Sequence, residues 1–125
     1  MESVDTTLFE SMVVEAIEHL PPEFSERIAN LEFTIEEWAR PDDMARTNSP
    51  RGSTLLGVYR GVPLTRRGSG YHMALPDTIV VFRGPLTRMA RDEDDLRQRV
   101  AHVVRHEVGH YFGISDDRLR EIGAY

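Results

Sequence analysis

The strongest constraint on this sequence is the stretch at residues 106–116, which reads HEVGHYFGISD. Its first five letters have the spacing H-E-x-x-H, and on a helix this spacing places His106 and His110 one turn apart on the same face. A rise of about 1.5 Å per residue separates the two Cα atoms by roughly 6 Å, so both imidazoles can reach one metal ion. The spacing therefore predicts a metal site on a helix.

Zinc suits this pair of donors, because it binds neutral imidazole nitrogens at about 2.0–2.1 Å. A catalytic zinc takes three protein ligands and keeps one position for water, and Glu107 stands where it can accept a proton from that water. Gly113 can end the helix with a positive φ and turn the chain back, so that Asp116 offers a carboxylate oxygen. We therefore predict His106, His110 and Asp116 as zinc ligands, with Glu107 as the general base.

Two other residues compete for the metal. Asp117 neighbours Asp116, and both carboxylates can face the ion, although the glycine spacing of the motif favours Asp116. His102 lies one turn before His106, but its Cα is about 12 Å from that of His110 along the helix axis, which is awkward for one tetrahedral ion. A histidine on the helix surface explains it better. The alternative without a metal is a buried helix with two hydrogen-bonded histidines and a coincidental glutamate.

The resemblance to known proteins extends beyond the motif. The spacing H-E-x-x-H-x-x-G-x-x-D resembles that of the zincin metallopeptidases, and is similar to the metzincins in the variant whose third ligand is Asp. From Leu8 to Tyr125 the chain resembles a family of small bacterial zincin-like metallopeptidase domains. Three segments carry this resemblance, at residues 55–65, 75–86 and 106–119.

This resemblance implies zinc at His106, His110 and Asp116, with Glu107 as general base. It also implies a minimal zincin fold. Metzincins carry a methionine-containing turn after the third ligand, beneath the metal, whereas no Met follows Asp116 in this chain. The floor of the site must therefore be built differently.

Composition indicates an ordinary globular chain, with 40% hydrophobic and 29% charged residues among 125. This length predicts one domain spanning residues 1–125. The chain has no cysteine, which excludes disulfides and thiolate metal sites. No apolar run is long enough to span a bilayer and no secretory signal is visible, so we expect a cytoplasmic bacterial protein with no membrane partner.

The charges are unevenly distributed. Residues 1–45 carry twelve acidic and two basic side chains, whereas residues 46–91 carry eight Arg and one Asp. An Arg-rich segment is one sign of nucleic-acid or anion binding. The basic and aromatic residues do not interleave as in a known nucleic-acid module. We therefore expect the Arg-rich segment to pack beside the acidic one, without a nucleic-acid partner.

Hydrophobic periodicity predicts an α+β fold. One apolar stripe at helical spacing indicates a helix over Asp5–Leu20, and alternation indicates a strand over Leu31–Glu36. Further strands are expected at Leu55–Tyr59 and Thr78–Arg83, the latter continuously apolar and so buried on both faces. The acidic run Asp92–Asp95 caps the helix that carries the motif. We predict a small twisted mixed sheet packed against the N-terminal helix and the active-site helix.

The remaining segments predict shorter features. Pro22–Asn30 reads as a short helix or turn, and Arg40–Thr54 as a loop that could border a cleft. Tyr71–Leu75 is an extended run, joined by a tight turn to the next strand, that would form the antiparallel edge of the sheet. An extended peptide can add to such an edge by backbone hydrogen bonds. Ser115 is a suitable N-cap for a last short helix.

The function that these features predict is hydrolysis of a peptide bond, with a peptide or protein as substrate. Zinc would polarise the scissile carbonyl, while Glu107 passes the proton to the leaving amine. Tyr71, His72 or Tyr125 could steady the oxyanion. Two other functions stay open: a zinc-stabilised binding or regulatory domain with weak or no hydrolysis, and an anion-binding module that uses the Arg-rich segment.

Overall fold

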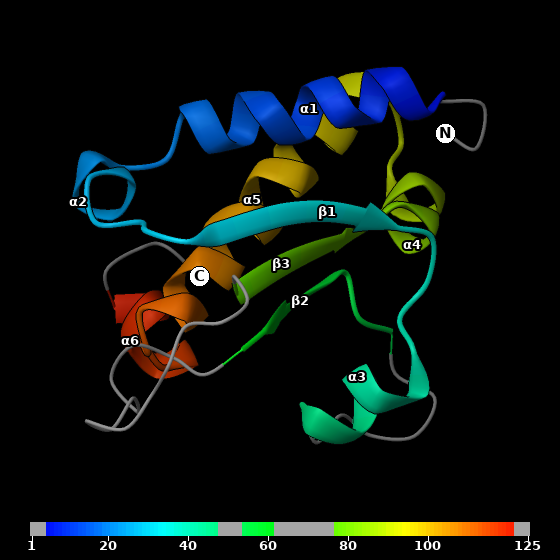
Figure 1. The fold of residues 1–125 in the computed structure, drawn as a ribbon. Coiled ribbons are helices and arrows are strands. Elements are labelled where there is room, and N and C mark those ends of the chain that lie inside the picture. Colours follow the sequence, from blue (N-terminus) through cyan, green and yellow to red (C-terminus); the bar gives the residue numbers. More distant parts are fainter. Residues whose placement is uncertain (1–4, 48–53, 62–76, 122–125) are drawn as a thin grey trace.

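The computed structural model describes residues 5–47, 54–61 and 77–121, and Figure 1 shows the arrangement. Helices and a small sheet form the α+β fold that the sequence predicted. Among the described residues, none of the helices is long and apolar enough to cross a membrane. The elements in chain order are α1 (Thr6–Glu18), α2 (Pro22–Ser25), β1 (Leu31–Glu36), α3 (Pro41–Arg46), β2 (Gly57–Arg60), β3 (Asp77–Phe82), α4 (Arg83–Met89), α5 (Glu93–Tyr111) and α6 (Asp116–Glu121).

The three described strands form a mixed sheet in the order β1-β3-β2. β3 pairs with β1 in parallel and with β2 antiparallel. Its apolar sequence is explained by the two hydrophobic clusters that cover its opposite faces. Residues 79–82 are all 0% exposed, which confirms the prediction.

Each face of the sheet has its own hydrophobic cluster, since successive side chains of a strand point to opposite faces. On one face, Ile79 and Val81 of β3 pack against α1 and α5. The apolar residues of α5 that bury there fix the rotation of that helix about its axis. The opposite face carries a smaller cluster of Val58, Val80 and Phe82.

Both long helices begin where the sequence indicated. The side chain of Asp5 accepts a hydrogen bond from Leu8 N at 2.7 Å and caps α1. The side chain of Asp92 accepts one from Asp95 N at 2.8 Å and caps α5. In each case the carboxylate binds one of the backbone N–H groups that the first turn of a helix leaves unbonded.

The prediction of a loop over Arg40–Thr54 is wrong in part, because α3 forms within it. Pro41 occupies the first turn of α3, where its missing N–H costs nothing. Asp43 accepts a hydrogen bond from Arg40 N at 2.9 Å, and is itself only 2% exposed. The partner that holds Asp43 inside the protein is Arg60 of β2, which is distant in sequence.

A second correction concerns Arg83, predicted as the end of a strand but found at the start of α4. The following residue, Gly84, explains the close approach there. A Cβ at Gly84 would lie 2.6 Å from both the carbonyl oxygen of Glu37 and the indole of Trp38. The absence of a side chain at Gly84 therefore lets the chain turn into α4 in close contact with Trp38.

Arg60 joins the acidic and basic parts of the chain. Its guanidinium lies 2.8 Å from Oε2 of Glu36 and 2.8 Å from Oδ2 of Asp43. Hydrogen bonds from Arg60 lower the pKa of both carboxyl groups. Arg83 and Glu37 form a further pair at 3.1 Å. These contacts confirm that part of the Arg-rich segment packs beside the acidic one.

Candidate metal centre

The last two turns of α5 carry the motif. Val104 and Val108 are 0% exposed and Tyr111 is 1% exposed, so this face of the helix is fixed in the core. The hydroxyl of Tyr111 also donates to Ala29 O at 2.8 Å and ties the helix to the chain before β1. Because these residues fix the helix rotation, the histidines of the motif emerge at the margin of the buried face.

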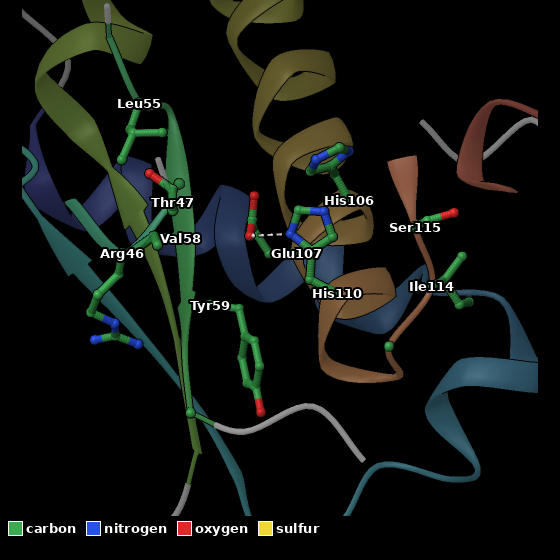
Figure 2. Close-up of a pocket in the computed structure, with 13 residues that line it drawn as sticks. Arg46, Thr47, Leu55, Val58, Tyr59, His106, Glu107, His110, Ile114 and Ser115 are labelled. Carbon is green, nitrogen blue, oxygen red and sulfur yellow. Dashed lines mark hydrogen bonds and ion pairs between the residues drawn. The ribbon is translucent and has the colours of Figure 1, made fainter. Parts of the chain in front are cut away.

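His106, Glu107 and His110 turn toward one another. One ligand atom from each lies within 4.8 Å of the other two. Nδ1 of His110 is 3.2 Å from Oε1 of Glu107, which is only 7% exposed. Figure 2 shows the three side chains in the space between α5 and β2. The structure therefore brings together three of the four residues that the sequence selected.

Gly113 ends the helix as predicted, with a φ of 78°. Gly113 N donates to His110 O at 2.9 Å, and Ile114 N donates to Gly109 O at 2.9 Å. This pair of bonds is the Schellman motif, which satisfies the last carbonyls of a helix and reverses the chain. The reversal carries the backbone past Ser115, whose Oγ accepts a hydrogen bond from Arg118 N at 3.2 Å and caps α6 as predicted.

Gly109 allows α6 to lie against α5. A Cβ at this position would be 2.6 Å from Cδ2 of Leu119, a residue of α6 that is 0% exposed. Asp116 is the first residue of α6, and its role as third ligand stays a prediction. The rival carboxylate, Asp117, is 92% exposed and lies 3.4 Å from Nη1 of Arg120.

The three side chains open into a hollow of about 610 Å³, which we call the central pocket. The wall opposite α5 is β2, and Arg46 and Thr47 border the pocket beyond it (Figure 2). The segment from Arg40 to Thr54 thus borders a cleft as predicted. The part of it that does so is the C-terminal end of α3 and not a loop. Ile114 and Ser115 line the other side.

Two wall residues were missed from the sequence. Gly57 lets β2 lie flush against α5, because a Cβ there would overlap Cγ1 of Val103 and lie 3.0 Å from Val80 O. Tyr59 faces the helices, and its hydroxyl donates to Oδ2 of the buried Asp77 at 2.7 Å. A glycine at the start of a strand is a known sign of close backbone approach, so Gly57 carried a signal.

His102 is not part of the ligand group among the described residues. Its ring stacks on that of His106, with the centroids 6.1 Å apart. The expectation of a surface histidine is only partly right, because the side chain is half-buried. Burial, and secondly the charge of Arg105, lower the pKa of His102, so its imidazole is neutral at neutral pH.

Several predictions lie outside the described residues. They are the edge strand at Tyr71–Leu75 and the oxyanion candidates Tyr71, His72 and Tyr125. Among the described strands, β2 is the one whose residues line the central pocket.

The donors present fit zinc. The imidazoles of His106 and His110 provide nitrogen atoms of the kind that zinc binds in catalytic sites, and the carboxylate of Glu107, which the sequence selected as general base, lies beside them. Two histidines one helical turn apart with an intervening glutamate, on a helix packed against a mixed sheet, define the zincin class of protein.

Comparison with known proteins assigns the family. The chain belongs to the zincin-like metallopeptidase family, whose sequence model matches residues 28–124. The fold is similar to that of a solved structure described as a conserved hypothetical protein from Thermo thermophilus. That similarity has a TM-score of 0.60 and 21% sequence identity, and it covers 87% of this chain and 94% of the other. No curated protein matches the chain at a significant level.

Proposed function

We propose that this protein is a zinc-dependent metallopeptidase. The observation that carries the proposal is the cluster of His106, the buried Glu107 and His110, whose ligand atoms lie within 4.8 Å of one another in the lining of a pocket of about 610 Å³. Membership of the zincin-like metallopeptidase family supports the same reaction. His106 and His110 would hold the ion from α5, and Asp116 would complete the site from α6.

The proposed third ligand is supported by the turn after α5. The Schellman motif at Gly113 reverses the chain, and the packing of Leu119 on Gly109 holds α6 beside the helix that carries the histidines. Asp117 is a poorer candidate because its carboxylate is largely exposed and lies near Arg120.

Bound zinc would supply a Lewis acid and lower the pKa of water at the site. Glu107 would act as the general base, taking a proton from the attacking water and giving it to the leaving amine. Its position supports this role, because the carboxylate lies beside His110 and is held between α5 and β2.

The test combines metal analysis with cleavage of a broad peptide library. We expect one zinc per chain in the purified protein, and loss of that zinc in His106→Ala and His110→Ala, because two remaining donors bind too weakly. Glu107→Gln is the matched variant: it should keep zinc and lose cleavage by at least about a hundredfold, since general-base catalysis contributes on that order.

Two results would contradict the proposal. One is a protein without transition metal even after zinc is supplied. The other is a Glu107→Gln variant that cleaves as fast as the wild type. A zinc-loaded wild type that binds peptides and cleaves none would instead favour a zinc-stabilised binding domain.

A further inference from the structure

The central pocket continues along α5. A second hollow, between α5 and residues 54–57, shares His106 and Glu107 with the central pocket. Past His102 it adjoins a third hollow of about 540 Å³, on the side of α5 nearer its N-terminus. We call these two adjoining hollows the α5 groove. A groove that begins at the proposed zinc site and follows one helix is suited to an extended chain.

Two arginines, Arg99 and Arg105, line the larger hollow of the α5 groove, and their surroundings differ. Nε of Arg99 donates to Oδ2 of Asp95 at 3.0 Å, so a carboxylate offsets its charge. Nε of Arg105 is buried, and no hydrogen-bond acceptor lies within reach of it in the part of the chain that the structure describes. Burial of a donor without an acceptor is costly, because the donor loses its water and gains nothing in exchange.

The neighbouring groups leave a positive charge at this end of the groove. Asp95 is engaged by Arg99 and also accepts a hydrogen bond from Arg91 N at 3.0 Å. His102 lines both hollows of the α5 groove, and an imidazole carries no negative charge that could offset that of Arg105. A ligand with a negative charge would therefore suit the groove.

We propose that Arg105 binds a carboxylate of the peptide substrate and so determines specificity. The proposal rests on the proposed function, because the groove begins at the proposed catalytic residues. A guanidinium presents a planar set of donors that matches a carboxylate, and the pair forms two parallel hydrogen bonds. Either the C-terminal carboxylate of a substrate or an Asp or Glu side chain offers this group.

The length of the α5 groove limits how far from the scissile bond the carboxylate can lie. The residues of α5 that line the groove and the site include Arg99 and His106, which are about 10 Å apart along the helix axis. An extended peptide advances about 3.3 Å per residue, so this length holds about three substrate residues. The acidic group should therefore belong to one of the three residues nearest the scissile bond on that side.

The test measures binding, with hydrolysis prevented by Glu107→Gln in the zinc-loaded protein. Fluorescent peptides are compared in pairs that differ only in Glu against Gln at one position, or in a free C-terminal acid against an amide. Fluorescence anisotropy should show about tenfold tighter binding, or more, for the acidic member at the matching position. Which of the two series shows the preference identifies the source of the carboxylate.

Added to the same background, Arg105→Gln should abolish the preference, and Arg105→Lys, which keeps the charge without the planar geometry, should retain only part of it. Arg97→Gln is the matched control. It removes the same charge from the same helix, but Arg97 points toward α1, where its Nε donates to Glu15 at 3.2 Å. This control should keep the full preference.

Equal binding of acidic and neutral peptides would overturn the proposal, as would a preference that survives Arg105→Gln in a folded, zinc-loaded protein. The result also separates this proposal from the proposed function. Wild type that cleaves peptides without regard to acidic residues refutes the carboxylate site alone. An Arg105-dependent preference in a protein that cleaves no peptide supports the carboxylate site and refutes the peptidase.

Discussion

Gly57→Ala tests the close packing of β2 against α5, which forms the two facing walls of the central pocket. A methyl group at this position would overlap Cγ1 of Val103 and lie 3.0 Å from the carbonyl oxygen of Val80. Neither neighbour can yield easily: Val80 O is backbone in the central strand, and a β-branched side chain on a helix has one strongly preferred rotamer. β2 and α5 must therefore separate, or Val103 must take a poorer rotamer.

The expected cost follows from these contacts. Overpacking of a well-packed core costs about 1–3 kcal/mol, and the lower entropy of unfolded Ala relative to Gly recovers about 0.4–1 kcal/mol. Gly57→Ala should thus destabilise the protein by roughly 1–2 kcal/mol. Val103→Ala should cost roughly 2–3 kcal/mol on its own, because it removes two buried methyl groups and leaves a cavity.

The double variant provides the sharper measurement. In Gly57→Ala/Val103→Ala the new methyl group occupies space that the lost ones leave, so the double variant should be more stable than the sum of the single effects by at least about 1 kcal/mol. Urea unfolding of all four proteins at one zinc concentration gives these free energies. Zinc content should be unchanged, since the added Cβ would lie at an ordinary 3.5 Å from Cγ of Glu107. Additive effects, or a Gly57→Ala variant as stable as wild type, would refute the reasoning.

Two further predictions concern the third ligand and the ion pairs of the sheet. Asp116→Ala should weaken zinc binding clearly more than Asp117→Ala in a competition titration with a chelator; equal losses would mean that the third ligand is misplaced. Arg60→Gln should destabilise the protein by about 3 kcal/mol near neutral pH, because it leaves the carboxylate of Asp43, which is 2% exposed, without its cation. Arg60 lowers the pKa values of Glu36 and Asp43 from 4.5 and 3.8, so its stabilisation is present above those values and is lost as pH falls through the lower folded-state pKa values. Urea unfolding between pH 7 and about pH 3 should therefore show the difference from wild type shrinking in acid, and a difference independent of pH would contradict this account.

The long elements were predictable because their periodicity is local. Leu31–Glu36 forms β1 with the predicted bounds, and the continuous apolar run of β3 indicated a strand buried on both faces before any pairing was known. The short helices were not predictable in the same way. α3 depends on the burial of Asp43 by Arg60, and α4 on the contact of Gly84 with Trp38, and both contacts join residues far apart in sequence.

The same distinction applies to the site. The spacing of His106, Glu107 and His110 was sufficient to predict their grouping, because one helical turn brings them together whatever surrounds the helix. The opposite wall could not be predicted from spacing. Gly57 and Tyr59 face α5 only because β2 pairs with the edge of β3 that β1 leaves open. This pairing is set by the packing of the whole sheet.

The strand order β1-β3-β2 also governs when this protein can fold during its synthesis. β1 and β2 both pair with β3, which follows them in the chain, so neither has its described neighbour until residue 82 has left the ribosome. α1 waits longer still, since its partner α5 ends at Tyr111. At ordinary rates of synthesis the apolar stripe of α1 stays uncovered for several seconds. We expect nascent chains that stop before β3 to stay unfolded and to need protection from aggregation, and the proposed zinc ligands to meet only after α6 has been made.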